Sequence, residues 1–379
     1  MDASAHADFL RLFSELQDPR RENRRYLLSD ILLLAVSAVM CGCEGWQDIE
    51  DWTEDAFEFL RPLMQQPQHG TPSADTFRRV FARLGPDGFE RCFSAWAQSL
   101  HPSSGGKLIA IDGKSLRRSF QQAWSKTPFH RVIAYASANG LILGQLKVDS
   151  KEKEIVAIPR LLELLNLKRA TVTIDAMGCQ KEIAGQILQA KGLDVLALKE
   201  NQPSLYQAVK KVMDEAFLEQ FKDVRHDYVE ETEGNHGRIE TRRVWVCDEI
   251  KWLRMADQWP GLRQMVMVQS RREVQGKVTT ERRYYMASHR KLDAQPTATA
   301  IGGHWGIENQ VHGVLDVTFN EDQSRIRREN GAENFSRLRR MVLNKLRAYE
   351  DRSGKKPSVR MKRKKCGWSF DYFLKVLTA

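Results

Sequence analysis

Three acidic residues stand at positions where a carboxylate can take part in chemistry. Asp112 ends the run IAID and Asp175 ends the run VTID, so each closes a short, apolar, β-branched segment of strand type. If the two strands are neighbours in one sheet, both carboxylates emerge at the same edge, where they repel each other unless a cation lies between them. Mg²⁺ prefers carboxylate, water and phosphate oxygens, so the pair predicts a magnesium site beside a phosphate group. Either acid taken alone is better explained as a turn residue at a strand end, and only the pair favours a metal site.

A third carboxylate is expected on a helix that packs against this sheet, and Glu308 in GGHWGIENQVHGVLDV is the candidate. On an α-helix Glu308 shares a face with His304 and His312, four residues before and after it. That spacing predicts a carboxylate between two imidazoles, suited to holding a metal ion or contacting phosphate. A zinc site is not indicated, because the two histidines lie two turns apart and no cysteine accompanies them. Three later acids remain alternatives for the third position: Asp316, Glu321 and Asp322.

The composition is that of a globular protein with a basic balance. The chain has 379 residues, 42% of them hydrophobic, and a formal net charge of +10, which favours polyanionic partners such as nucleic acid. Its six cysteines do not form a disulfide framework or a zinc motif, so reduced thiols in a cytoplasmic protein are expected. The start MDASAHADFL has no basic segment of a signal peptide, and the longest apolar run, residues 31–41, is too short to span a membrane.

The elements that must position the acids follow from the pattern of apolar residues. Residues 1–100 are predicted to be helical, and the loop composition HPSSGG marks the first boundary. Residues 107–221 then predict three antiparallel strands, a helix, a strand, a helix and a strand, with Asn139-Gly140 as a two-residue hairpin turn. Residues 222–290 are predicted to form a β-rich insertion, and residues 291–350 are again helical and carry Glu308. Residues 351–379 are a basic tail, of which 355–365 is expected to be solvated. The expected fold is therefore a mixed α/β sheet flanked by helices, behind an N-terminal helical domain.

Several of these stretches, in this order, resemble the H-repeat-associated (ISAs-type) DDE transposases. The resemblance covers the chain up to about residue 350 and is carried by LLSDILLLAVSAVMCGCEGWQDIEDW, HGTPSADTFRRVFARL, IAIDGKSLRRS, TIDAMGCQKEIA, LALKENQPSLY, NHGRIETRRVWV and HWGIENQVHGVLDVTFNEDQSRIR. It implies a ribonuclease-H-like core and a catalytic Asp, Asp, Glu triad, which by motif are Asp112, Asp175 and Glu308. It also implies two Mg²⁺ ions, for which Mn²⁺ substitutes, and hydrolysis at the ends of an insertion sequence followed by joining of the 3′-end to target DNA.

The resemblance implies double-stranded DNA as partner, namely terminal inverted repeats and target DNA, with a homodimer pairing two DNA ends. It also implies that residues 1–100 form a transposase-associated domain that binds DNA. Side chains near the acids are then candidates for contacting phosphate groups. These DNA-binding candidates are Lys114, Arg117, Arg118, Lys199, Asn201, His236, Arg238, His304 and His312.

Two other functions remain open at the level of sequence. One is a nuclease that cuts DNA without joining strands. The other is a DNA-binding protein that has lost catalysis, in which the three acids are dispensable. Gly302 and Gly313 stand where the family usually carries larger groups, which favours a decayed or weakened site.

Overall fold

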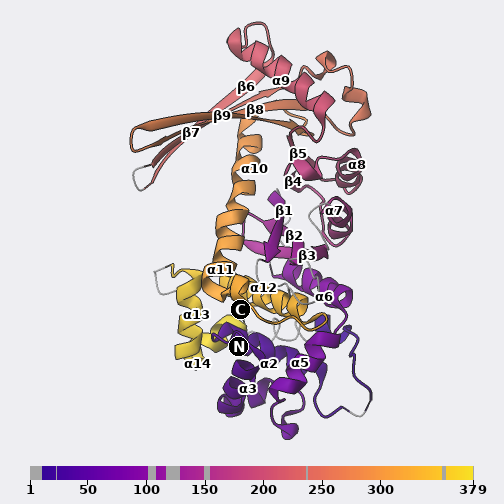
Figure 1. Ribbon diagram of the computed structural model, residues 1–379, viewed down its shortest axis with the longest axis vertical. Helices are drawn as coiled ribbons and strands as arrows, with labels where there is room; N and C mark the ends of the chain where they lie inside the picture. The colour runs from indigo at the N-terminus through magenta and orange to yellow at the C-terminus, as the bar shows by residue number, and fades with distance from the viewer. Residues whose placement is uncertain are drawn as a thin grey trace. The chain divides into compact units, whose positions relative to one another are not determined.

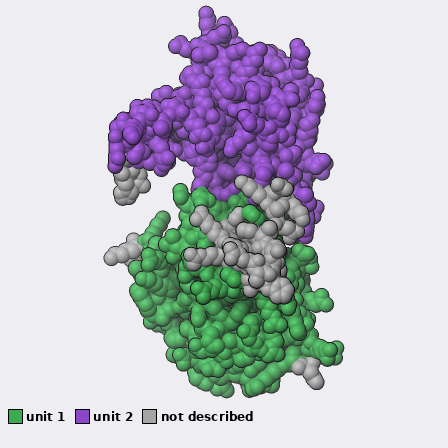
Figure 2. All heavy atoms as spheres, in the orientation of Figure 1, with its two compact units in different colours: residues 1–103, 113–153, 308–379 green, residues 104–112, 154–307 purple. Residues whose placement is uncertain are grey.

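The computed structural model describes seven stretches of the chain: residues 11–22, 24–100, 108–116, 129–148, 154–235, 238–351 and 356–378. The chain divides into two compact units (Figure 2). Unit 1 comprises Met1–Ser103, Gly113–Lys153 and Glu308–Ala379, and unit 2 comprises Ser104–Asp112 and Glu154–Ile307.

Unit 1 is built mainly of helices, as the apolar pattern of the first hundred residues predicts. Its elements include α2 (Leu28–Met40), α3 (Trp46–Asp55), α4 (Phe57–Leu60), α5 (Ala74–Arg83), α6 (Pro86–Ser99), the hairpin strands β2 (Phe129–Ala136) and β3 (Leu141–Val148), α11 (Gly313–Phe319), α12 (Gly331–Ala348), α13 (Val359–Trp368) and α14 (Phe370–Leu377) (Figure 1). The run of apolar residues in α2 is buried on all sides, where α3, α12 and α13 pack around it. Of the helices in the described stretches, none combines the length and the apolar content needed to cross a membrane.

The end of the chain differs from the solvated tail expected from its charge. Residues 359–377 form α13 and α14, with Cys366, Phe373 and Val376 buried. The basic residues bind the C-terminal ends of other helices, where carbonyl groups lack helical partners. Lys362 Nζ donates to Leu346 O at 2.7 Å near the end of α12, and Arg363 Nε donates to Val39 O at 3.1 Å near the end of α2. The high density of basic residues in this segment therefore did not mean that their side chains are exposed to solvent.

Unit 2 carries most of a nine-stranded mixed sheet. The strands follow the order β3-β2-β1-β4-β5-β9-β8-β7-β6, and the division between the units falls within β1. Strands β1, β4 and β5 run parallel, as expected when helices connect them. The elements of this part are β1 (Leu108–Leu116), α7 (Glu154–Glu163), β4 (Thr171–Ile174), α8 (Lys181–Gln189), β5 (Leu193–Leu198), α9 (Pro203–Leu218), β6 (His226–Asn235), β7 (Arg238–Cys247), β8 (Gln264–Val274), β9 (Lys277–Ala287) and α10 (Ala294–Ile307). In Figure 1, α10 lies on one side of β4 and β5 while α7 and α8 lie on the other.

The β-rich segment continues the same sheet, because β9 pairs antiparallel with β5 and β8, β7 and β6 follow as antiparallel neighbours. Strand β6, with the sequence HDYVEETEGN, was missed from sequence, because its many acids hide the alternation that marks a strand. The turn between β2 and β3 also differs from the expected two residues. Ala136 pairs with Leu141, so the turn spans four residues, and Gly140 takes a positive φ of 73° within it.

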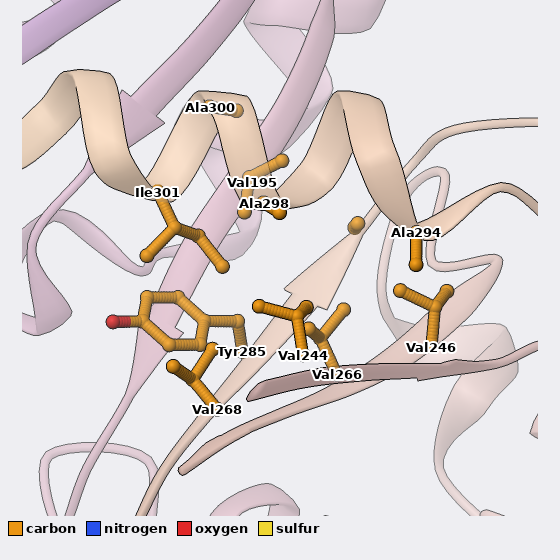
Figure 3. Close-up of a cluster of buried hydrophobic side chains, with 11 residues drawn as sticks. Val195, Val244, Val246, Val266, Val268, Tyr285, Ala294, Ala298, Ala300 and Ile301 are labelled. Atoms are coloured by element: carbon orange, nitrogen blue, oxygen red, sulfur yellow. The ribbon is translucent and has the colours of Figure 1, made fainter. Parts of the chain in front are cut away.

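A compact apolar cluster holds α10 against the sheet (Figure 3). Valine side chains rise from β5, β7 and β8, and Tyr285 rises from β9. They meet Ala294, Ala298, Ala300 and Ile301 of α10, whose small side chains let the helix approach the strands closely. This packing sets where the last turn of α10, with His304, lies relative to β4.

Asp194 is a buried acid within the sheet. It lies on β5 opposite Val172, its side chain has no exposed area, and its backbone N–H donates to Ser288 Oγ at 2.7 Å. Burial raises the pKa of Asp194 to about 7, and the Ser288 hydroxyl opposes part of that rise. The folded protein therefore holds a proton on Asp194 across a pH range in which the unfolded chain has lost it.

Asp194→Asn should remove a pH-dependent loss of stability. Because the folded pKa of about 7 lies above the unfolded value, Asp194 favours folding less and less as the pH rises from about 4 to about 7. The free energy of unfolding of the variant minus that of the wild type should rise by up to about 3 kcal/mol between pH 5 and pH 8. Urea denaturation across this range measures the difference, with exposed Asp223→Asn as the control. A constant difference would show that Asp194 is ionised at pH 5.

Candidate functional site

The register of β1 against β4 places the first two acids next to each other within unit 2. The paired residues end at Ile111 and Ile174, so Asp112 and Asp175 are the next position on each strand. Adjacent strands lie about 4.8 Å apart, and equivalent positions of parallel strands project to the same face. Strand β1 itself continues to Leu116 rather than ending at Asp112 as predicted, although its pairing with β4 stops before the acid.

The backbone that carries Asp175 is held in a tight turn. Asp175 is the N-cap of the 3₁₀ turn Ala176–Gly178, and its carboxylate accepts a hydrogen bond from Gly178 N at 3.4 Å. A Cβ atom at Gly178 would collide with the side chain of Ile174, so glycine is required by this close approach. Asn201, which follows β5, donates from Nδ2 to Ala176 O. Asn201 is therefore a positioning residue for Asp175 in this structure.

His304 lies in the last turn of α10, beside both acids. Its Nδ1 is 3.1 Å from Thr173 Oγ1 on β4, two residues before Asp175. Burial lowers the pKa of His304, and the negative charges of Asp112 and Asp175 oppose this effect. The imidazole is therefore mainly neutral at pH 7, which leaves a nitrogen able to bind a metal ion or accept a proton.

In unit 1, the residues just after Asp112 contact the segment that Glu308 begins. The spacing predicted an α-helix through Glu308, but Glu308–His312 is a π-helical turn between α10 and α11. Lys114 on β1 donates from Nζ to His312 O at 3.2 Å and to Asp316 Oδ2 at 2.6 Å. Such π-helical turns are rare and occur often at functional sites, because they re-aim side chains within a helix.

Two further residues of unit 1 hold the π-helical turn. The Tyr135 hydroxyl on β2 hydrogen-bonds to the Gln310 side chain, and Arg347 on α12 donates to Gln310 O. Glu308 is exposed while His312 is buried, so their side chains differ in environment despite the spacing of four residues. The turn is thus fixed from three sides, by Lys114, Tyr135 and Arg347.

Glu321, one of the alternatives for the third acid, has a structural role. Its side chain is wholly buried, with Arg131 Nη2 at 2.6 Å from Oε2 and Arg340 Nη1 at 2.9 Å from Oε1. Burial alone raises the pKa of Glu321, but the guanidinium groups of Arg131 and Arg340 outweigh it and hold that pKa well below 4.5. Asp316, the second alternative, forms the ion pair with Lys114. Glu321 is therefore not available as an open metal ligand, and one oxygen of Asp316 is held by Lys114.

The remaining DNA-binding candidates occupy different environments. Lys199 is exposed after β5, and Arg238 is half-buried at the start of β7, where it pairs with Glu240. His312 is buried and His304 is half-buried, and Lys114 forms an ion pair with Asp316 within unit 1. Three candidates lie outside the described residues: Arg117, Arg118 and His236.

An arginine pair on the sheet next to His304 was missed by sequence reasoning. The ring of Trp305 contacts two guanidinium groups, with Arg242 Cζ of β7 at 4.8 Å and Arg283 Cζ of β9 at 4.6 Å from the ring centroid. A Cβ atom at Gly302 would meet Arg242 Nη1 at 3.2 Å, so the glycine leaves room for this stack. The signal in the sequence is the doubled arginine of TRRVWV and ERRYYM, each within an alternating strand.

Comparisons with known proteins agree with this architecture. Residues 10–97 match the DDE_Tnp_1-associated family model, and residues 103–345 match the model of the Transposase DDE domain. A relative named "Putative transposase YncI", from Escherichia coli, is 40% identical over 97% of this chain and 93% of its own length. "H repeat-associated putative transposase YhhI", also from Escherichia coli, is 38% identical over 92% of each chain. A piggyBac transposase in a synaptic complex with hairpin DNA aligns at 12% identity over 99% of this chain and 80% of its own, with a TM-score of 0.44, which is too low to carry an argument.

The parallel β1, β4 and β5, the antiparallel β2 and β3, and these matches together define a DDE transposase with a ribonuclease-H-like mixed sheet. Within that class, the chain belongs to the H-repeat-associated (ISAs-type) family of bacterial insertion sequences. The resemblance and the fold class predicted from sequence are both confirmed.

Glu321→Gln should strongly destabilise the protein, because it leaves Arg131 and Arg340 buried without their shared counter-charge. Breaking a buried ion pair by removing one partner costs about 3–5 kcal/mol. Urea denaturation at pH 7 should show a loss of that size, whereas Glu329→Gln, at an exposed ion pair, should change stability by less than about 0.5 kcal/mol. Equal stabilities of the two variants would contradict the structural role of Glu321.

Proposed function

We propose that this protein is a metal-dependent DNA transposase that uses Asp112, Asp175 and Glu308 as its catalytic acids. In this proposal it hydrolyses a phosphodiester at the end of an insertion sequence and joins the resulting 3′-end to target DNA. The observation that carries the proposal is the β1–β4 register, which brings Asp112 and Asp175 to equivalent positions beside the half-buried His304.

Chain continuity supports Glu308 as the third acid. Asp112 is two residues before Lys114 on β1, and Lys114 holds the carbonyl of His312. His312 ends the π-helical turn that Glu308 begins, so the contact ties the end of β1 to this turn. The same contact makes Lys114 a positioning residue in the proposal, acting through Asp316 and the backbone of His312.

The carboxylates of Asp112, Asp175 and Glu308 would hold two Mg²⁺ ions, with Mn²⁺ as a substitute. When bound, such a pair of ions activates the attacking oxygen and stabilises the leaving oxygen of an in-line displacement. The protein's own contribution is to fix the three acids, through the Asp175 turn, the packing of α10 and the tethered π-helical turn. The neutral His304 can take or hold a proton beside Asp112 and Asp175.

The DNA partners in the proposal are double-stranded terminal inverted repeats and a target duplex, bound by a homodimer that pairs two element ends in the cytoplasm. The net charge of +10 supports a polyanionic partner. The competing functions are a nuclease without strand transfer and a decayed DNA-binding protein. The reaction products distinguish them, because a nuclease yields cleaved but no joined DNA and a decayed protein yields neither.

Replacing a catalytic acid should abolish cleavage while leaving the fold intact. Asp112→Asn, Asp175→Asn and Glu308→Gln should each lower the rate of cleavage in Mg²⁺ by roughly three orders of magnitude, because several kcal/mol of metal-dependent stabilisation is lost. A gel that resolves nicked and strand-transfer products from a duplex carrying the element end measures both steps. Glu329→Gln, an exposed acid outside the site, is the matched control.

Wild-type activity of Glu308→Gln would place the third acid elsewhere. Cleavage without joined products would identify a nuclease. If neither the wild type nor any variant cleaves in Mg²⁺ or Mn²⁺ while all bind the duplex, the protein is a decayed DNA-binding member of the family.

Lys114→Met and Asp316→Asn test whether Lys114 positions the site or contacts DNA directly. If Lys114 acts through Asp316, each variant should slow cleavage by about ten- to a hundredfold, as for other residues that orient metal ligands. The double variant should then be no slower than the slower single variant. An effect of Lys114→Met alone, with Asp316→Asn unchanged and DNA affinity reduced, would identify a direct phosphate contact instead.

A further inference from the structure

A cavity lined by arginines lies in unit 1, among the N-terminal helices. It has a volume of about 590 Å³ and lies between the connector before α2 and the outer face of α5. Its basic lining consists of Arg20, Arg21, Arg24, Arg25, Arg79 and Arg83. The described parts of the catalytic site contain none of these residues. The sequence predicts a DNA-binding domain over residues 1–100 but singles out none of these arginines.

The charge of this cavity exceeds what its own acids neutralise. Six arginines face two glutamates, Glu50 and Glu54, in the lining. Glu50 accepts a hydrogen bond from Ala74 N at 2.9 Å, so its charge is directed at the first turn of α5. Asp18, at the edge, binds Arg20 at 2.8 Å and lies 3.4 Å from Arg24, and Asp75 pairs with Arg79. Among the described residues, no such counter-charge is shared with Arg21, Arg25 or Arg83.

The arginines come from two separate elements that line one cavity. Arg20 and Arg25 are anchored to backbone carbonyls, of Tyr26 at 2.7 Å and His69 at 3.0 Å respectively. Arg79 and Arg83 are four residues apart, on one face of α5. Arg21 and Arg83 are both exposed. The anchors hold guanidinium groups in place before a ligand arrives, which lowers the entropy lost on binding.

The lining favours phosphate oxygens over other anions. Guanidinium groups donate in a planar fork that matches two oxygens of one phosphate. The first turn of α5, a ten-residue helix, is part of the lining through Ser73 and Thr76, and its positive end adds to the attraction of an anion. Several forks along two walls suit a row of phosphates, as in a nucleic-acid backbone, better than one isolated ion.

We propose that this arginine cavity binds the phosphate backbone of duplex DNA and thereby holds the DNA independently of the catalytic acids. The choice of DNA as the source of the phosphates rests on the proposed function. Contacts to phosphates position a duplex without reading its bases, so the cavity contributes affinity rather than sequence preference.

The test is DNA binding in EDTA, where cleavage cannot contribute. The double variant Arg21→Ala/Arg83→Ala is compared with the wild type and with Arg61→Ala/Arg91→Ala, which removes the same charge from exposed positions of the same helical part outside the cavity. Fluorescence anisotropy is recorded with a duplex carrying the element end and with an unrelated duplex, between roughly 50 and 200 mM salt.

The cavity variant should bind both duplexes on the order of tenfold more weakly, and the slope of log K against log salt should fall by about two, one for each lost phosphate contact. The control pair should retain the wild-type slope. Arg21→Lys/Arg83→Lys keeps the charge and should retain most of the slope, which separates lost charge from misfolding.

Equal slopes for the cavity and control variants would overturn the inference. So would full displacement of the duplex by millimolar inorganic phosphate, which would identify a site for free phosphate. Glu329→Gln, which changes an exposed acid outside both sites, should bind like the wild type in this assay. DNA binding in EDTA tests the proposal for the arginine cavity, whereas cleavage in Mg²⁺ tests the proposal for the catalytic triad. The two proposals can therefore fail independently.

Discussion

The register between β1 and β4 is the constraint on which the site depends. Parallel strands paired from Leu108 with Thr171 to Ile111 with Ile174 leave Asp112 and Asp175 as the next pair of positions. A shift of one residue would place one of the two acids on the opposite face of the sheet, because side chains alternate along a strand. The buried residues Ile109, Ile111, Val172 and Ile174 secure this register, so the apolar part of each strand decides where its acid lies.

The part of unit 1 that follows β1 is organised by buried charge. Glu321 joins Arg131 of β2 to Arg340 of α12. A second residue of α12, Arg337, binds Glu90 of α6, with Nε 2.6 Å from Oε2. Buried ion pairs add little net stability, but they tolerate few alternative arrangements, since an unpaired charge in the interior is costly. They therefore specify how α12 lies against the β2–β3 hairpin. Arg347 of α12 in turn contacts the π-helical turn that begins at Glu308.

The basic composition serves two purposes in this protein. Arg131, Arg337 and Arg340 are fully buried, and Arg363 binds the end of α2, so these residues stabilise the fold rather than attract a polyanion. Other arginines gather where solvent reaches them, along the arginine cavity and beside Trp305. A net charge of +10 is thus a weaker guide to the DNA-facing surface than the burial and the partners of each arginine.

The sequence by itself determined the fold class and the family, and it placed Asp112 and Asp175 directly after short apolar runs of strand type, because such runs and the order of the motifs are local features. It also predicted the helical N-terminal part and most strands, but it missed β6, whose acids obscure the alternation, and the helices α13 and α14, whose basic residues bind carbonyls distant in sequence. The π-helical turn at Glu308, the burial of Glu321 and the engagement of Lys114 with Asp316 were decided by tertiary structure alone. Each depends on contacts between segments about 200 residues apart, and no periodicity along the chain encodes which of several similar charges finds which partner.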